Sequence, residues 1–552
     1  MMSLLIAENS RSSFTILLPG EEERCLTFAA KELAKYLSAI SGAEFPIIRG
    51  NIPPSPSSPL FILEAEKELP DQLDAYSYKV ESGSLHFKGV NPRSTLYGVY
   101  DFLEELGCSF AEPGIETVPK LPTLIYKGNG RSSKSTFILR NIFREQIQLQ
   151  KAKPFYGLEK DHIPQIDFMA KRRCNHYDFY VDYCRFDLWE KHKHNVLDAL
   201  LDRGFKLEVC HHSIGYFFPS EAAKDYGDFG PSTYYANHPE WYLKNQARIE
   251  IPEVAEIITD RYLAYVERNP ELKMIGVWPG DSGMPPPAEG MNVADGYLIF
   301  WNNISKRLAE KFPDKYLSTI AYFDLWDPPK VMRGAENQML WFCPIRSNYH
   351  YSMTDHPANA AYLKQMEGWI GKMPPGRVNV FDYFGWQPIL IPYARNMQKS
   401  LRTYRDLGAA GAYGWVGFTL NLMGVEYRWA RDLYSYCNLL WDPDHDVEKD
   451  KEVWAKGVFG SASDAIVDFY DCLQEEHDKI LLTCKPAAMK PWITIPLLHK
   501  LQEILAKARG SAESNAVLKR VDLLEQLAAN GSAAKIIEES EEKSRHDPLN
   551  RL

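Results

Sequence analysis

The feature that most constrains the fold of this chain is a series of eight short β-rich segments, separated mostly by amphipathic helical segments. Apolar, aromatic and β-branched residues dominate these segments, which is typical of buried strands. The segments are FILRNIFRE (137–145), HYDFYVDY (176–183), FKLEVCHHS (205–213), KMIGVWPGD (273–281), YLSTIAYFD (316–324), QMLWFCPI (338–345), VNVFDYFG (378–385) and GAYGWVGF (411–418). Strands that alternate with helices form parallel sheets, and eight such units in about 300 residues predict an α/β fold with a (β/α)8 TIM barrel.

The segments between these strands have the apolar spacing of amphipathic helices. They are 188–203, 252–269, 294–312, 360–373 and 396–407. The connection 325–337 is too short and too rich in proline for a full crossover helix, so we expect an irregular barrel there.

The 552 residues suggest about two to four domains. Residues 1–130 are predicted to form a small α+β domain, with helices at 26–41 and 94–106 and strands at 45–48 and 60–65. The predicted catalytic barrel spans 131–441. Residues 442–552 are polar and helical, with periodic segments at 463–483 and 494–528, and form the predicted helical C-terminal region.

Composition excludes several classes of protein. The formal net charge is −10, and the sequence has no block of basic residues that could bind along a phosphate backbone. Nucleic acid is therefore not an expected partner. No apolar run reaches the length of a membrane span, the first residues lack the pattern of a secretory signal, and the nine cysteines are scattered. A reduced cytoplasmic protein fits best. Aromatic residues make up 13% of the chain. Such residues can fill a large core or stack on the flat faces of sugars.

Catalytic groups of a barrel lie at the carboxyl ends of its strands. In this sequence those ends carry acidic, basic and aromatic residues together. Each one alone has a structural explanation, such as a helix cap or a core histidine, and their coincidence favours a site. The predicted substrate-binding residues are Arg144, His211, His212, Trp278, Tyr322, Asp324, Arg346, His350, Tyr383, Trp386 and Trp415.

Glycoside hydrolysis needs one carboxylic acid to protonate the leaving oxygen and a second group to stabilise or attack the anomeric carbon. Asp281 and Asp382 are the predicted catalytic pair. Both follow apolar strands and stand beside aromatic residues, which raise the pKa of an acid by desolvation and stack on a pyranose ring. Arg346 can hold a uronic carboxylate by a bidentate contact.

Other chemistries lack their motifs. There is no GxxxxGK[ST], HExxH or GxSxG sequence, and GNGRSS at 128–133 lacks the third glycine of a dinucleotide loop. The HKH at 192–194 lies on a predicted amphipathic helix and is more typical of a solvated face than of a metal site. We therefore expect neither cofactor nor metal, and a small carbohydrate as the partner.

Two parts of the chain resemble known families. TFAAKELAKYLSAISGAEFPI and STLYGVYDFLEELGCSFAEPGIETVP resemble the domain that precedes the barrel in bacterial α-glucuronidases and β-N-acetylhexosaminidases. From 140 to about 530 the chain resembles a glycoside-hydrolase-like family of formerly unknown function that includes endo-β-N-acetylglucosaminidases acting on N-glycans. The matching pieces are FMAKRRCNHYDFY, RGF, HHS, HPEWY, Asp281, AYFDLWDPP, Arg346, VFDYF, GAAGAYGW and CNLLWDPDHD. The resemblance implies a glycosidase acting on an N-acetylhexosaminide or a uronide.

The sequence differs from that family around the predicted catalytic carboxylates. The family commonly shows cysteines after the aspartate of the fourth strand and a glutamate near the seventh or eighth, whereas this chain has SGMPPPAEG and Asp382. Glu289 and Glu426 are possible replacements for the glutamate. Two alternatives therefore stay open: a non-catalytic saccharide-binding protein on the same scaffold, and a uronate lyase or epimerase.

Overall fold

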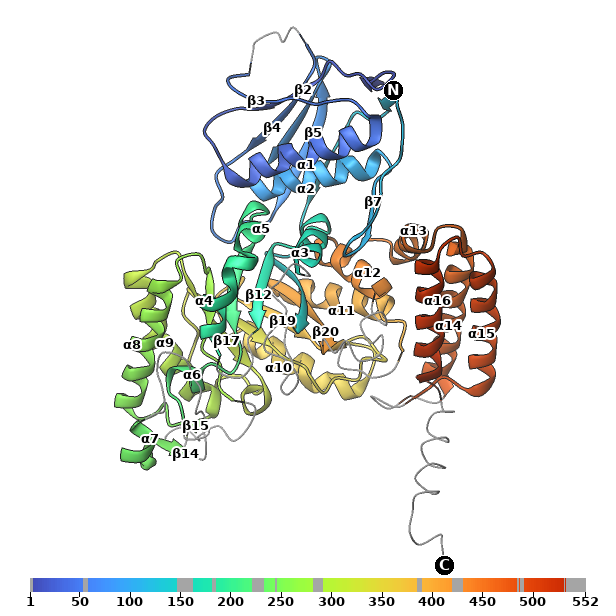
Figure 1. The fold of residues 1–552 in the computed structure, drawn as a ribbon. Helices are drawn as coiled ribbons and strands as arrows, with labels where there is room; N and C mark the ends of the chain where they lie inside the picture. The colour runs from blue at the N-terminus through green and yellow to red at the C-terminus, as the bar shows by residue number, and fades with distance from the viewer. Residues whose placement is uncertain are drawn as a thin grey trace, which may run out of the picture.

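Figure 1 shows the computed structural model of the protein. The structure describes residues 3–52, 58–145, 162–180, 185–220, 233–243, 246–280, 291–384, 390–418, 430–483, 486, 491–530 and 532. The side chains at 143–145, 180, 233 and 415–418 lie outside this description.

The N-terminal part is a six-stranded sheet with two helices packed together on one face (Figure 1). In spatial order the strands are β10 (Gly130–Lys134), β5 (Ala75–Glu81), β6 (Ser84–Gly89), β4 (Leu60–Ala65), β2 (Thr15–Leu18) and β3 (Ile47–Arg49). The helices are α1 (Arg24–Ser41) and α2 (Pro92–Glu105). Two ribbons flank them, β1 (Leu4–Ala7) with β9 (Leu124–Tyr126) and β7 (Ser109–Glu112) with β8 (Ile115–Thr117).

Local signals set both helices. The Glu23 side chain accepts a hydrogen bond from the Leu26 backbone N–H at the start of α1, and Gly42, with φ of 77°, ends it in the left-handed conformation. Asn91 caps α2 in the same way through the Ser94 N–H. The two predicted helices and the predicted strand at 60–65 are therefore confirmed.

The central part is an eight-stranded parallel sheet that curls into a nearly closed barrel. In spatial order its strands are β11 (Leu139–Glu145), β20 (Gly411–Phe418), β19 (Val378–Asp382), β18 (Gln338–Phe342), β17 (Tyr316–Ala321), β16 (Met274–Gly276), β13 (Lys206–Cys210) and β12 (His176–Tyr180). The Asn175 N–H donates to the Arg140 carbonyl across the β11–β12 gap. All eight predicted strands are present, and the predicted fold class is confirmed.

The barrel part contains helices, most of which lie around its strands (Figure 1). They are α3 (His162–Lys171), α4 (Asp187–His192), α5 (Leu197–Asp202), α6 (Ile214–Phe217), α7 (Thr233–Asn237), α8 (Pro252–Arg268), α9 (Val293–Lys311), α10 (Ala360–Ile370), α11 (Ala394–Leu407) and α12 (Ala430–Trp441). Short 3-10 turns occur at η1 (Lys193–Asn195), η3 (Pro239–Trp241), η4 (Phe323–Leu325) and η5 (Pro357–Asn359), and β14 (Tyr242–Leu243) pairs with β15 (Gln246–Ala247).

Two connections between barrel strands differ in how closely they match the sequence prediction. The predicted helix 188–203 is wrong as a single element, because η1 interrupts it where Lys193 Nζ reaches Glu271 at 2.8 Å. Between β17 and β18 the chain is irregular, as predicted: residues 322–337 are all described, and they contain η4 but no α-helix. The Asp295 carboxylate holds this connection by accepting three backbone N–H groups, from 330 to 332.

Four further helices form a bundle beside the barrel (Figure 1). They are α13 (Val447–Phe459), α14 (Ser463–Thr483), α15 (Ile495–Gly510) and α16 (Asn515–Asn530). The indole N–H of Trp492 donates to the Leu390 carbonyl at 2.7 Å, which ties the bundle to the barrel. No helix within the described ranges has the length and apolar character required to cross a membrane.

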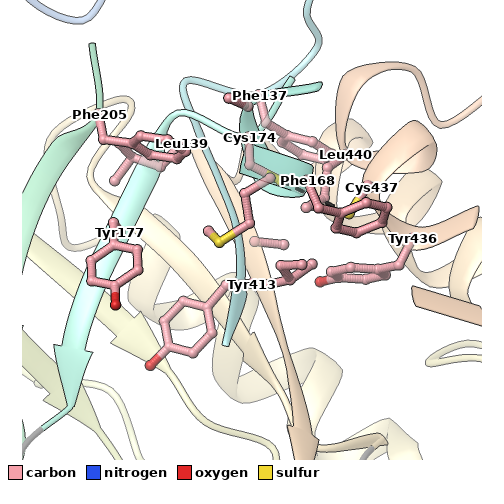
Figure 2. Packing of buried hydrophobic residues seen from close by; sticks show 14 of the residues in the cluster. Phe137, Leu139, Phe168, Cys174, Tyr177, Phe205, Tyr413, Tyr436, Cys437 and Leu440 are labelled. Atoms are coloured by element: carbon pink, nitrogen blue, oxygen red, sulfur yellow. Dashed lines mark hydrogen bonds between the residues drawn. The ribbon is translucent and has the colours of Figure 1, made fainter. Parts of the chain in front are cut away.

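Apolar and ionic contacts join the N-terminal sheet to the barrel. Figure 2 shows Phe168, Cys174 and Cys437 among the buried side chains packed near the start of the barrel strands. Asp74, which is fully buried, accepts hydrogen bonds from Arg93 of α2 and at 2.5 Å from Arg140 of β11. These buried contacts fix the orientation of the barrel against the sheet.

Candidate active site

Two adjacent histidines, His211 and His212, directly follow β13 at the carboxyl end of the barrel. Their ring centroids lie 4.5 Å apart, and both residues are buried. His212 Nδ1 lies 2.5 Å from the carbonyl oxygen of Pro279, and its ring lies 6.2 Å from that of Tyr322. Burial lowers the pKa of His212 to about 4, so the ring is neutral near pH 7. Since a carbonyl only accepts, Nδ1 carries the proton and Nε2 has acceptor character.

Backbone strain marks the same end of the barrel. His211 has φ of 142° and Phe323, just after β17, has φ of 45°. These values lie in regions that residues with a Cβ avoid, at a cost of about 1–3 kcal/mol each. Such strain persists where the surrounding structure fixes it, and it concentrates at functional sites. The two strained residues are thus the sequence neighbours of His212 and Tyr322.

Tyr322, Asp324 and Arg346 lie on the segments that follow β17 and β18. Tyr322 is buried and its ring lies 4.1 Å from that of Phe323. Asp324 and Arg346 are exposed, and the Arg346 guanidinium lies 5.1 Å from the centre of the Phe323 ring. An exposed cation therefore stands beside an aromatic pair at this rim.

Trp278 lies inside the barrel wall. Its indole N–H donates to Ser318 Oγ at 3.1 Å, its backbone N–H donates to Ser213 Oγ at 3.1 Å, and the residue is 1% exposed. Stacking of Trp278 on a sugar stays a prediction, and burial of the ring does not favour it.

Asp382 and Tyr383 are neighbours in sequence whose side chains face opposite sides of the wall. The Tyr383 ring stacks on Phe381 at 4.3 Å, and Phe381 lies 4.1 Å from Tyr413 of β20 in the interior. The side chain of Asp382 is directed toward α11, where the Tyr404 hydroxyl donates to its Oδ1 at 3.0 Å. Burial raises the pKa of Asp382 to about 7. A catalytic role for Asp382 stays a prediction that this orientation does not favour.

His350 lies against the helical bundle. Its Nδ1 is 3.0 Å from His477 Nε2 of α14, and both rings are buried. Burial lowers the pKa of His350 to about 3 and that of His477 to about 4. The ring of His350 thus packs against the helical bundle.

Four predicted site residues cannot be placed in full. Asp281 and Trp386 lie outside the described residues, and Arg144 and Trp415 belong to β11 and β20 with side chains outside the description. The alternative acids Glu289 and Glu426 also lie outside it. Their roles stay predictions.

The structure adds a buried polar network that sequence reasoning missed. Asn141 Nδ2 donates to Asp178 Oδ1, His176 Nε2 lies 2.9 Å from Glu208 Oε2, and the Trp341 indole N–H donates to Glu208 Oε1 at 3.2 Å. Asp178 and Glu208 are paired in register on β12 and β13. The signal was in the sequence, because His176 and Asp178 occupy alternate positions of an otherwise aromatic strand and therefore share one face.

Asp178 has the electrostatic character of a proton-exchanging group. Burial raises its pKa to about 7, and the neighbouring charge of Glu208 adds to the effect. A carboxyl group with such a pKa exchanges its proton near neutral pH. Within the described ranges, no group of three or more His, Cys, Asp or Glu side chains has an arrangement that could hold a metal ion.

Solved structures with the same fold are glycoside hydrolases. A GH138 enzyme that targets pectin rhamnogalacturonan II aligns with 93% of this chain and 85% of its own, at a TM-score of 0.62 and 11% identity. A GH115 4-O-methyl-α-glucuronidase with specificity for decorated arabinogalactans aligns with 94% of this chain and 71% of its own, at 0.60 and 15%. A GH89 protein from Clostridium perfringens, in complex with GlcNAc-alpha-1,4-galactose, aligns with 91% and 61%, at 0.56 and 12%.

These likenesses establish the fold, since the identities are low. No curated protein matches the chain. Residues 112–471, which include all eight barrel strands and α13, match the family model described as a domain of unknown function, DUF4838. The chain belongs to the DUF4838 family.

Proposed function

We propose that this protein is a glycoside hydrolase that binds its sugar at the carboxyl end of the barrel strands. The observation that carries the proposal is the strained backbone of His211, next to His212 and Tyr322, at the end of the barrel where enzymes of this fold have their active sites. The fold shared with glycoside hydrolases supports it.

The polar groups at this rim fit a carbohydrate. His212 is neutral near pH 7, and its Nε2 can accept a hydrogen bond from a sugar hydroxyl. The exposed Arg346 supplies a charge-assisted contact for a uronic carboxylate. An N-acetylhexosaminide or a uronide is therefore the proposed substrate class, and the charge of Arg346 favours the uronide.

Asp281 is the proposed proton donor, because in the sequence it comes five residues after the end of β16, and catalytic groups of this fold follow the carboxyl ends of the strands. Asp382, the other predicted acid, is kept as a variant to be tested, since its carboxyl group contacts Tyr404 of α11. Asp178 is a third carboxyl group to compare, because it lies in the interior and has a raised pKa.

A panel of chromogenic N-acetylhexosaminides, hexosides and uronides tests the proposal. We expect turnover of one class by the wild type, and a loss of at least ~10²-fold in kcat for Asp281→Asn. Asp464→Asn, at an exposed position of α14, is the matched control and should keep full turnover. Turnover of no substrate in the panel would contradict the proposed hydrolase activity. Undiminished turnover by Asp281→Asn would contradict Asp281 as the proton donor.

A non-catalytic saccharide-binding protein is the second candidate. The orientation of Asp382 favours it, because the rim then lacks one of the two predicted carboxyl groups. This candidate predicts that an oligosaccharide changes the tryptophan fluorescence of the protein and is recovered intact. Release of any cleaved product that Asp281→Asn abolishes would exclude it.

A further inference from the structure

A cavity lies at the opposite end of the barrel from the candidate active site. Its volume is about 230 Å³, and it is lined by the first residues of several strands, including Lys206 of β13, Met274 of β16 and Tyr316 of β17. The loop 68–71 of the N-terminal part forms another wall. Ligand pockets for drug-sized molecules are about 300–1,000 Å³, so this cavity suits a smaller molecule.

The acids that line the cavity already have partners. The Asp71 carboxylate accepts from Arg377 at 2.8 Å and from the Tyr316 hydroxyl at 3.1 Å. Glu68 accepts from Arg93 at 2.8 Å. These acidic side chains therefore give the cavity little affinity for a cation.

The lysines are less well satisfied. Within the described part of the chain, Lys206 Nζ has its ion-pair partner Glu68 at 3.7 Å, which is beyond hydrogen-bond distance. Lys273 Nζ lies 3.6 Å from Asp314, an exposed residue. Two ammonium groups on the cavity wall thus have room for a closer anionic partner.

The charges around Lys206 do not balance, and three of them, on Arg93, Arg140 and Asp74, are buried. Among the described residues, the three cations Arg93, Arg140 and Lys206 share the two carboxylates Asp74 and Glu68, at N–O distances of 2.5–3.7 Å. One positive charge is in excess, and an uncompensated charge in such surroundings is costly. Consistently, burial and the nearby Arg93 lower the pKa of Lys206 to about 8. A single excess charge matches a monoanion better than a phosphate dianion.

The remaining wall is apolar. Leu69, Leu139, Met274 and Met339 line it, so the ligand should carry a hydrocarbon body. We propose that this cavity binds a small organic carboxylate, whose anionic group pairs with Lys206 and whose apolar body lies against Met274 and Met339. The proposal does not depend on glycosidase activity, because the cavity and the candidate active site lie at opposite ends of the strands.

Calorimetric titration of the full-length protein at pH 7 and constant ionic strength tests the proposal, with isobutyrate, its uncharged analogue isobutyramide and inorganic phosphate as probes. We expect saturable binding of isobutyrate, with isobutyramide and phosphate at least ~10-fold weaker. Equal binding of the acid and the amide, tighter binding of phosphate, or no binding of isobutyrate would overturn it.

Lys206→Met should abolish isobutyrate binding, whereas Lys364→Met, at an exposed position of α10, should bind like the wild type. Wild-type protein at pH 9.5 provides a second arm that needs no folded variant. Lys206 is neutral there, so the affinity for isobutyrate should fall at least ~10-fold. Wild-type affinity in folded Lys206→Met, or unchanged affinity at pH 9.5, would contradict the assignment.

Discussion

The hydroxyl of Tyr404 donates a hydrogen bond of 3.0 Å to Asp382, and this contact directs the carboxyl group toward α11 rather than into the barrel. Burial raises the pKa of Asp382 to about 7, well above the ordinary 3.8. The contribution of this group to stability is therefore full below pH 4 and is lost as the pH rises through 7.

Asp382→Asn should consequently be more stable than the wild type at pH 8, by about 2–4 kcal/mol, and similar to it at pH 4. Its turnover should change less than that of Asp281→Asn. Thermal unfolding at the two pH values measures the effect, with Asp464→Asn as control. An equal loss of stability at both pH values would contradict the raised pKa, because the effect would then not depend on the charge of the carboxyl group.

Replacement of His211 should separate strain from chemistry. At an ordinary position glycine is about 0.5–1 kcal/mol less stable than alanine, but at φ of 142° the order should reverse. We expect His211→Gly to exceed His211→Ala in stability by about 1 kcal/mol, with both impaired in sugar binding. Denaturant titration compares the two variants. A more stable His211→Ala variant would contradict the backbone strain at His211.

The His350 and His477 pair should make the attachment of the helical bundle sensitive to acid. Burial lowers both pKa values, to about 3 and about 4, so the stability from the neutral pair is present above pH 6.5 and is lost as the pH falls toward 3. His477→Gln should therefore lose less stability than the wild type between pH 6.5 and 4. The melting temperature of both proteins across this range tests it, and parallel curves would rule the pair out as the cause.

Arg346 should discriminate between charged and neutral sugars. Since a charge-assisted contact is worth about 1.5–3 kcal/mol, Arg346→Gln should raise KM for a uronide about 10-fold or more and change KM for the matching neutral hexoside less than about 2-fold. Arg402→Gln, a partly exposed arginine of α11, is the control. Equal changes for the two substrates would assign Arg346 a structural role.

Asp74 should be among the most sensitive positions of the chain. It is fully buried between Arg93 and Arg140, so Asp74→Asn leaves two buried cations short of a counter-charge and should cost about 3–5 kcal/mol. Asp198→Asn removes an exposed partner of Arg24, 87% accessible, and should cost less than about 1 kcal/mol. Comparable losses in the two variants would contradict the burial argument.

The order of elements was predictable from the sequence because each strand of the barrel is a short apolar run with a helix or loop on either side. The direction of single side chains was harder to predict. Asp382 ends its strand, yet Phe381 and Tyr383 are the residues that face inward, since adjacent positions in a strand alternate. Register with a neighbouring strand is needed to decide between the two faces.

Contacts between distant segments were beyond the sequence pattern. His350 follows β18 closely, as a rim residue would, but α14 covers it with His477, which is 127 positions away. The network of Asp178 and Glu208 was readable in principle, because polar residues alternated within otherwise apolar strands. Both residues lie in the middle of their strands, away from the ends where catalytic groups of this fold are expected.

The charge that neutralises Arg140 of the first barrel strand comes from Asp74, in the preceding sheet. Neither portion is electrostatically complete by itself. Any exchange of the N-terminal module between relatives would have to bring an equivalent acid with it, so the two portions are constrained to be inherited as one unit.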